Sequence, residues 1–206
     1  GYITGIFEGV DLDIQAYRPM LVYLNGEFWG LYNLREKVNE HFIAGHHSVD
    51  PDEIDLIEVQ TANEGTIDNY NALIDYVGNA NMENQNVYDS LSNWIDIDNH
   101  INYNIAQIFI DNRDWPGNNI KYWRPQSDDG LWRWILYDTD FGFGIPWSGL
   151  AYDYNTLEFA VEEDGPGWPN PPWSTFLFRK MLENSNYRER FINIFSDRFN
   201  TIFKPQ

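Results

Sequence analysis

Residues 111–119 read DNRDWPGNN and residues 137–142 read YDTDFG, and these two stretches decide how the chain is interpreted. The first stretch places Asp114 and Asn119 on either side of a Pro-Gly pair, which predicts a tight polar loop. The second follows an apolar, aromatic run and carries two further aspartates, which predicts a strand that delivers carboxylates at its end. Polar side chains are therefore expected to gather between a loop and a strand end.

Two interpretations of these residues remain open. Phosphoryl transfer needs a carboxylate to orient the attacking hydroxyl and oxygen ligands to hold a metal. Asp114, Asn119 and the pair Asp138 and Asp140 occur in that order. The alternative is structural: Asp114 and Asn119 form an Asx-turn, and the two later aspartates close a strand-end turn.

Composition narrows the class of protein. A chain of 206 residues with 43% hydrophobic residues suits a single ordered domain, residues 1–206. The net charge of −19 argues against nucleic acid and anionic membranes and favours basic partners or ligands bridged by divalent cations. The chain has no cysteine, which excludes disulfides and zinc-thiolate sites. No apolar run approaches the ~18 residues of a membrane span.

The pattern of residues predicts an α+β class. Runs 20–24 and 27–34, joined by Asn25-Gly26, predict a β-hairpin. The following residues predict a short helix that Glu36 opens and Gly45 ends. Further elements are expected as a strand at 54–59, a helix around 70–77, a helix at 98–109 capped by Asp96 or Asp98, strands at 120–124 and 131–137, and two helices after Ser174.

Two segments are expected to lack regular structure. Residues 79–87 are rich in Asn and predict a loop or a boundary between lobes. Residues 143–173 hold many of the prolines and aromatic residues and predict a long ordered loop near a site.

At this point the chain resembles the CotH kinase family, which are spore-coat-type atypical kinases. The resemblance lies in residues 22–37, 94–98, 112–119 and 134–140. It implies a divergent protein-kinase-like fold with two lobes. Residues 1–78 would be a partial N-terminal lobe with the β-hairpin, and residues 79–206 a mostly helical C-terminal lobe with the catalytic hairpin.

The same resemblance implies transfer of the γ-phosphate of ATP to Ser or Thr of a protein, with Mg²⁺ or Mn²⁺. Carried over residue by residue, Asp114 is the catalytic carboxylate and Asn119 a metal ligand. Asp138 ranks first as the metal-binding Asp. Asp140, which opens the triplet Asp-Phe-Gly, ranks second, and in extended geometry the two side chains share a face.

The residues that the resemblance implies for nucleotide binding are less complete than those that it implies for catalysis and metal binding. Glu36 is similar to a helix Glu that pairs with a phosphate-binding Lys, or else it pairs on the surface with its neighbours. The family's Arg-Gly-Asn-Ser segment and Lys-rich strand have no counterpart here, so a truncated and inactive chain is one expectation. Lys121 and Arg124 flank the predicted loop, where they either steer phosphate or are solvated hairpin charges.

The expected partner is a basic protein that contains Ser or Thr, and the expected location is the bacterial cell surface or the medium. A non-catalytic module that binds protein or glycan through the aromatic-rich 143–173 loop is the alternative, and a metal-dependent hydrolase is the third. Two residue groups carry further alternatives. Histidines 41, 46 and 47 bind a metal or lie on the surface, and tryptophans 132, 134, 147, 168 and 173 stack on sugar or cover apolar surface.

Overall fold

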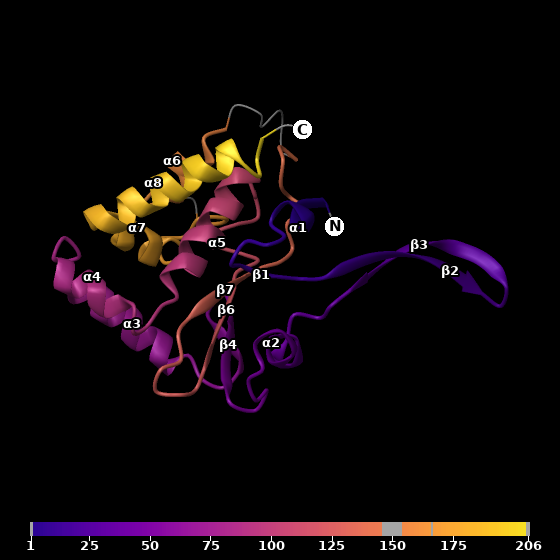
Figure 1. Ribbon diagram of the computed structural model, residues 1–206, viewed down its shortest axis with the longest axis horizontal. Helices are drawn as coiled ribbons and strands as arrows, with labels where there is room; N and C mark the ends of the chain where they lie inside the picture. The colour runs from indigo at the N-terminus through magenta and orange to yellow at the C-terminus, as the bar shows by residue number, and fades with distance from the viewer. Residues whose placement is uncertain (1, 146–153, 166, 205–206) are drawn as a thin grey trace.

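Strand pairing joins segments that lie far apart in the sequence into one five-stranded sheet, in the order β1-β7-β6-β4-β5. The computed structural model describes residues 2–145, 154–165 and 167–204 (Figure 1). The strands of the sheet are β1 (Asp13–Ile14), β4 (Ile54–Glu58), β5 (Thr61–Glu64), β6 (Lys121–Pro125) and β7 (Arg133–Leu136). Strand β1 pairs parallel with β7, and the other neighbours pair antiparallel.

Helices cover both faces of this sheet. They are α1 (Tyr2–Ile6), α2 (Glu40–His47), α3 (Asp68–Asn79), α4 (Gln85–Leu91), α5 (Ile97–Phe109), α6 (Thr156–Ala160), α7 (Phe176–Glu183) and α8 (Ser185–Asn200). The main core combines the sheet with α3, α5, α7 and α8, while α2 packs on a smaller core. Among the described residues, no helix is both long enough and apolar enough to cross a lipid bilayer.

Alternation along the strands explains the two cores. Neighbouring residues of a strand point to opposite faces. Tyr122 and Trp134 accordingly belong to the main core, whereas Trp123 and Ile135 belong to the core beneath α2. Both faces of the central strands β4, β6 and β7 are therefore largely buried.

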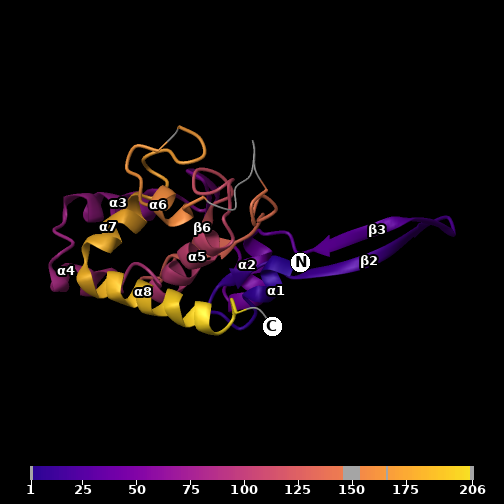
Figure 2. The same cartoon turned by 90° about the horizontal axis from the view of Figure 1, so that it is seen from above.

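A separate two-stranded hairpin extends away from this body in both views (Figures 1 and 2). It consists of β2 (Tyr17–Leu24) and β3 (Glu27–Arg35), joined by Asn25 and Gly26 with φ of 52° and 87°. Such angles suit Asn and Gly, and they form the turn that the sequence predicts. The hairpin leaves large apolar side chains in solvent, and Leu31 is 67% exposed.

The α+β class and most predicted elements are confirmed, with three corrections. The helix after the hairpin spans Glu40–His47 with Asn39 as its cap, so Glu36 lies outside it. Helix α4 begins at Gln85, within the predicted 79–87 loop, because the Asn84 side chain caps it. Helix α6 lies inside the predicted 143–173 loop, of which residues 146–153 and 166 fall outside the described residues.

Candidate active site

The Asp114 carboxylate is held by two amides of its own loop. Asn118 Nδ2 and Asn119 Nδ2 both donate to Asp114 Oδ2, at 3.0 and 2.6 Å. Asp114 is only 8% exposed. Both amides bond the same oxygen, and no hydrogen bond to Oδ1 is found within the described residues.

A chain of buried side chains anchors this loop to α5. Asn112 Oδ1 accepts from the Asp114 backbone N–H at 3.2 Å, and this bond closes an Asx-turn. Asn112 Nδ2 donates to Gln107 Oε1 at 2.8 Å, and Gln107 Nε2 donates to the Tyr103 hydroxyl at 3.1 Å. This Asx-turn is formed by Asn112 and positions Asp114, whereas the Asx-turn expected around Pro116-Gly117 is replaced by two side-chain amides that bond the Asp114 carboxylate.

Close packing fixes the other end of the loop. The Gly117 N–H donates to the Pro169 carbonyl oxygen, and a Cβ at Gly117 would overlap Pro169 and Pro171. Only glycine therefore allows the two backbones to approach this closely. The loop that carries Asp114 is consequently braced from both α5 and the 169–171 segment.

Asp138 and Asp140 lie on a turn just beyond β7. Asp138 has a left-handed backbone, with φ of 48°, so the expected extended geometry is wrong. The two carboxylates still meet, because the turn brings them into hydrogen-bond contact. Desolvation, this contact with Asp140, and the negative charges of Asp140 and Asp114 raise the pKa of Asp138, while the Arg35 guanidinium opposes that rise.

Asn119 connects the two groups of carboxylates. Its Nδ2 donates to Asp114 and also lies 3.5 Å from the Asp138 backbone oxygen. Asn119 has a left-handed φ of 52°, a conformation that Asn tolerates better than most residues. The structure thus brings together Asp114, Asn119, Asp138 and Asp140, the four residues that the sequence singles out.

The oxygen donors in this place fit a hard divalent cation. Among the described residues, no group of three or more His, Asp or Glu side chains is arranged to hold a metal. The residues that could contribute donors are Asp138 and Asp140 through their carboxylates and Asn119 through its amide oxygen, and Mg²⁺ prefers oxygen donors of these kinds together with water. A bound cation would also relieve the repulsion that raises the pKa of Asp138.

A cavity of about 260 Å³ opens beside Asp138 and Asp140. Its other walls come from α1, from the segment after β1 and from the base of the hairpin. The lining residues are Ile3, Thr4, Gln15, Tyr17, Arg35, Tyr137, Asp138, Thr139 and Asp140. The acidic turn therefore faces a hollow and not bulk solvent alone.

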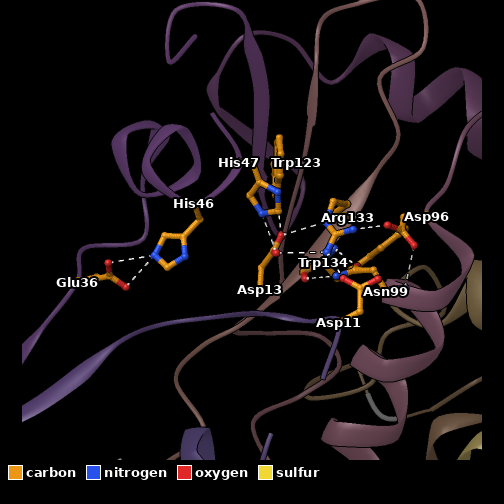
Figure 3. A network of polar contacts seen from close by, with 10 residues as sticks. All are labelled: Asp11, Asp13, Glu36, His46, His47, Asp96, Asn99, Trp123, Arg133 and Trp134. Atoms are coloured by element: carbon orange, nitrogen blue, oxygen red, sulfur yellow. Dashed lines mark hydrogen bonds and ion pairs between the residues drawn. The ribbon is translucent and has the colours of Figure 1, made fainter. Parts of the chain in front are cut away.

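Glu36 lies at the base of the hairpin, and within the described residues it forms no ion pair with a lysine. Its carboxylate accepts from the Ala16 N–H at 2.8 Å and pairs with His46 at 3.0 Å (Figure 3). Desolvation acts to raise the pKa of Glu36, but these two contacts outweigh it and hold the pKa below its usual value. The expected pairing with Arg35 or Lys37 is replaced by a pairing with His46.

Lys121 is buried, so the interpretation as a solvated hairpin charge is wrong for this residue. Its Nζ donates to the Val38 carbonyl at 3.3 Å, lies 3.5 Å from Glu58 and sits over the Tyr137 ring. Arg124 is likewise engaged, with Nε 2.9 Å from Asp55. Both ion pairs follow from the pairing of β4 with β6, because Glu58 is the register partner of Lys121 and Asp55 is that of Arg124.

Sequence reasoning missed a partly buried ionic network around Arg133. Its guanidinium contacts the carboxylates of Asp11, Asp13 and Asp96 (Figure 3). Asp13 also accepts from His47 and from the Trp123 indole, each at 2.8 Å. The parallel pairing of β1 with β7 assembles this network, and two residues of β1 give no periodic signal by which to predict it.

The tryptophans do not form one platform. Trp132 and Trp134 are buried in the main core, so they are unavailable for stacking on sugar. Trp168 is exposed, whereas Trp173 packs against the core, and Trp147 lies outside the described residues. The covering of apolar surface is therefore the correct interpretation for Trp132, Trp134 and Trp173.

Fold and site together define a mixed α+β domain in which a braced acidic loop between a helix and a β-hairpin meets a second pair of carboxylates. The chain belongs to the CotH kinase family: the family model described as CotH kinase protein matches residues 2–206. The resemblance drawn from the sequence is thus confirmed, and the family marks a kinase-like domain with a protein as substrate. No curated protein matches the chain.

Proposed function

We propose that this domain transfers the γ-phosphate of ATP to Ser or Thr of a protein, with a divalent metal, on a divergent two-lobed kinase-like fold. One observation carries the proposal: the Asn119 amide contacts both the Asp114 carboxylate and the backbone of Asp138. A base and a cation-binding pair are thereby held side by side, as phosphoryl transfer requires.

Asp114 has the role of orienting the attacking hydroxyl. The two asparagine amides both donate to its Oδ2 and thereby fix the orientation of the carboxylate group. The direction in which Oδ1 points is fixed as a result. A substrate Ser or Thr hydroxyl that donates to Oδ1 would be positioned for in-line attack. The buried hydrogen bonds that brace the loop keep this orientation without help from the substrate.

Asp138, Asp140 and the Asn119 oxygen would hold Mg²⁺ or Mn²⁺. The metal would supply charge neutralisation for the phosphates of ATP. The protein's part is to keep two carboxylates close together despite their repulsion, which the turn after β7 accomplishes. The net charge of −19 in turn favours a basic protein segment as the phosphate acceptor.

Transfer of radiolabelled phosphate from ATP to a basic Lys- and Ser-rich peptide tests the proposal. Asp114→Asn should lower the rate by roughly 10²–10⁴-fold, the range of a general base. Asp138→Asn should weaken metal-dependent ATP binding as well as the rate. The matched control is Asp129→Asn, the same change at an exposed residue of the β6–β7 turn. Transfer by Asp114→Asn at the control's rate would contradict the assignment.

A non-catalytic binding module is the second candidate, and the exposed apolar hairpin favours it, because such surfaces mark protein-binding sites. Calorimetric titration with ATP and Mg²⁺ separates the two candidates. A pure binding module predicts no metal-dependent heat of ATP binding, whereas the proposed kinase predicts binding that Asp138→Asn reduces.

A further inference from the structure

The cavity beside the acidic turn is lined by groups of opposite charge. Asp138 and Asp140 come from the turn after β7, and Arg35 comes with Tyr17 from the base of the hairpin. Tyr17 and Arg35 are register partners, the pair at the base of the hairpin. The hairpin therefore brings a cation to a hollow that already holds two carboxylates.

The backbone at Arg35 is fixed by its neighbour. Glu36 accepts from the Ala16 N–H through its side chain, and its carbonyl accepts from the Gln15 side chain. Glu36 thus joins the two ends of the hairpin on the residue next to Arg35. This position is defined by hydrogen bonds and does not depend on the exposed part of the hairpin.

Arg35 differs from several cations of the body. Arg113, Arg124, Arg133 and Lys121 each lie within 4.0 Å of a carboxylate. Within the described part of the chain, Arg35 forms no such ion pair, although it lines the same cavity as Asp138 and Asp140. In a chain with 32 acidic and 13 basic residues, a cation that faces two aspartates without binding either leaves room for a group between them.

We propose that Arg35 binds the phosphates of the nucleotide in the cavity that it lines together with Asp138 and Asp140. This role rests on the proposed function. Arg35 would take the place of the phosphate-binding Lys that has no counterpart in this sequence. A guanidinium offers paired N–H donors that match phosphate oxygens. A metal held by the two carboxylates would neutralise part of the phosphate charge, and Arg35 would neutralise another part.

The size of the cavity agrees with this role. Sites that enclose a whole small molecule have volumes of about 300–1,000 Å³. The cavity here has about 260 Å³ and is lined by charged and polar groups, including Gln15 and Thr139. It suits the phosphate chain of a nucleotide, with the base lying outside it.

Calorimetric titrations of the whole chain with ATP and with adenosine, in the presence of Mg²⁺, test the role of Arg35. Arg35→Gln should weaken ATP binding at least tenfold and leave the affinity for adenosine unchanged, and Arg35→Lys should recover part of the loss. The matched control is Arg18→Gln, the same change at an exposed residue of β2 whose register partner is Leu34. This control should bind ATP as the wild type does.

Each outcome has a definite meaning. If the wild type binds ATP and Arg35→Gln binds it equally well, the role of Arg35 is wrong and the proposed kinase stands. A wild type that shows no metal-dependent ATP binding overturns the proposed function and this inference together. If Arg35→Gln and Arg18→Gln lose the same amount of affinity for ATP, the loss comes from the change in net charge alone. That result would also overturn the inference.

Discussion

The sheet and the hairpin contain the same kinds of residue, but the sheet buries them and the hairpin exposes them to solvent. Trp123, Trp132 and Trp134 lie on sheet strands or at their ends and are almost completely buried. Trp29, on β3 of the hairpin, is 62% exposed. Both regions have the β-rich, aromatic sequence that predicts strands. Local sequence therefore sets the strand, whereas burial depends on which helices reach its faces.

The charges of the two regions show the same contrast. Arg133 in β7 contacts three carboxylates, and Arg124 in β6 contacts Asp55. Arg18 and Arg35 on the hairpin make no ion pair within the described residues. Stability is thus expected to reside in the body, and the hairpin should tolerate substitution.

The largest expected effect comes from removing a buried indole. Trp132→Ala should lower the free energy of unfolding by about 3–5 kcal/mol, because it leaves a cavity and removes the hydrogen bond to Asn69. Trp29→Ala should change it by less than about 0.5 kcal/mol. Chemical denaturation of both variants measures the difference, and a similar cost for both would break the contrast between body and hairpin.

The ionic network should give the next largest effect. Arg133→Met leaves the buried Asp13 without its guanidinium partner, which should cost about 3 kcal/mol. Arg18→Met is the control on the hairpin, and it should cost less than about 0.5 kcal/mol. The same denaturation experiment applies. An unchanged midpoint for Arg133→Met would show that the network does not stabilise the fold.

His100 provides a smaller effect that depends on pH. Burial lowers the pKa of His100 to about 3, and its Nδ1 lies 2.8 Å from the Tyr187 hydroxyl. Below the unfolded pKa of about 6.5, His100 is protonated in the unfolded chain but stays neutral in the folded chain. The stability of the fold therefore falls as pH falls toward 3. At pH 5 this linkage should cost about 2 kcal/mol.

Unfolding titrations between pH 7 and pH 5 measure this linkage. His100→Gln cannot titrate, so its stability should fall less over that range than that of the wild type. His41→Gln, at a side chain that is 74% exposed, should keep the wild-type slope. An identical slope in His100→Gln would remove His100 as the cause.

How much the sequence predicts depends on the range of the interaction that forms each feature. The Asn25-Gly26 turn and the apolar periodicity of α3 and α5 are local, and their elements are predicted well. Helix α4 and strand β1 are short and lack such periodicity. They exist because other parts of the chain pack on them.

The site divides in the same way. The contact between Asn119 and Asp114 follows from their spacing in one loop. The burial of Lys121 does not, because its partner Val38 lies 83 positions away and only the fold brings them together. The left-handed turn at Asp138 is likewise a tertiary result, and so is the position of Arg35.

The pairing of β1 with β7 also has a consequence for synthesis. Asp13 and Arg133 are 120 positions apart, so the bonds between them form only after the residues between them have been synthesised. At about 5–20 residues per second, this interval lasts on the order of ten seconds. During that time the first strand has no partner, and the hairpin beside it exposes its aromatic residues to the cell. Strand β1 is therefore made long before the strand that pairs with it in the sheet.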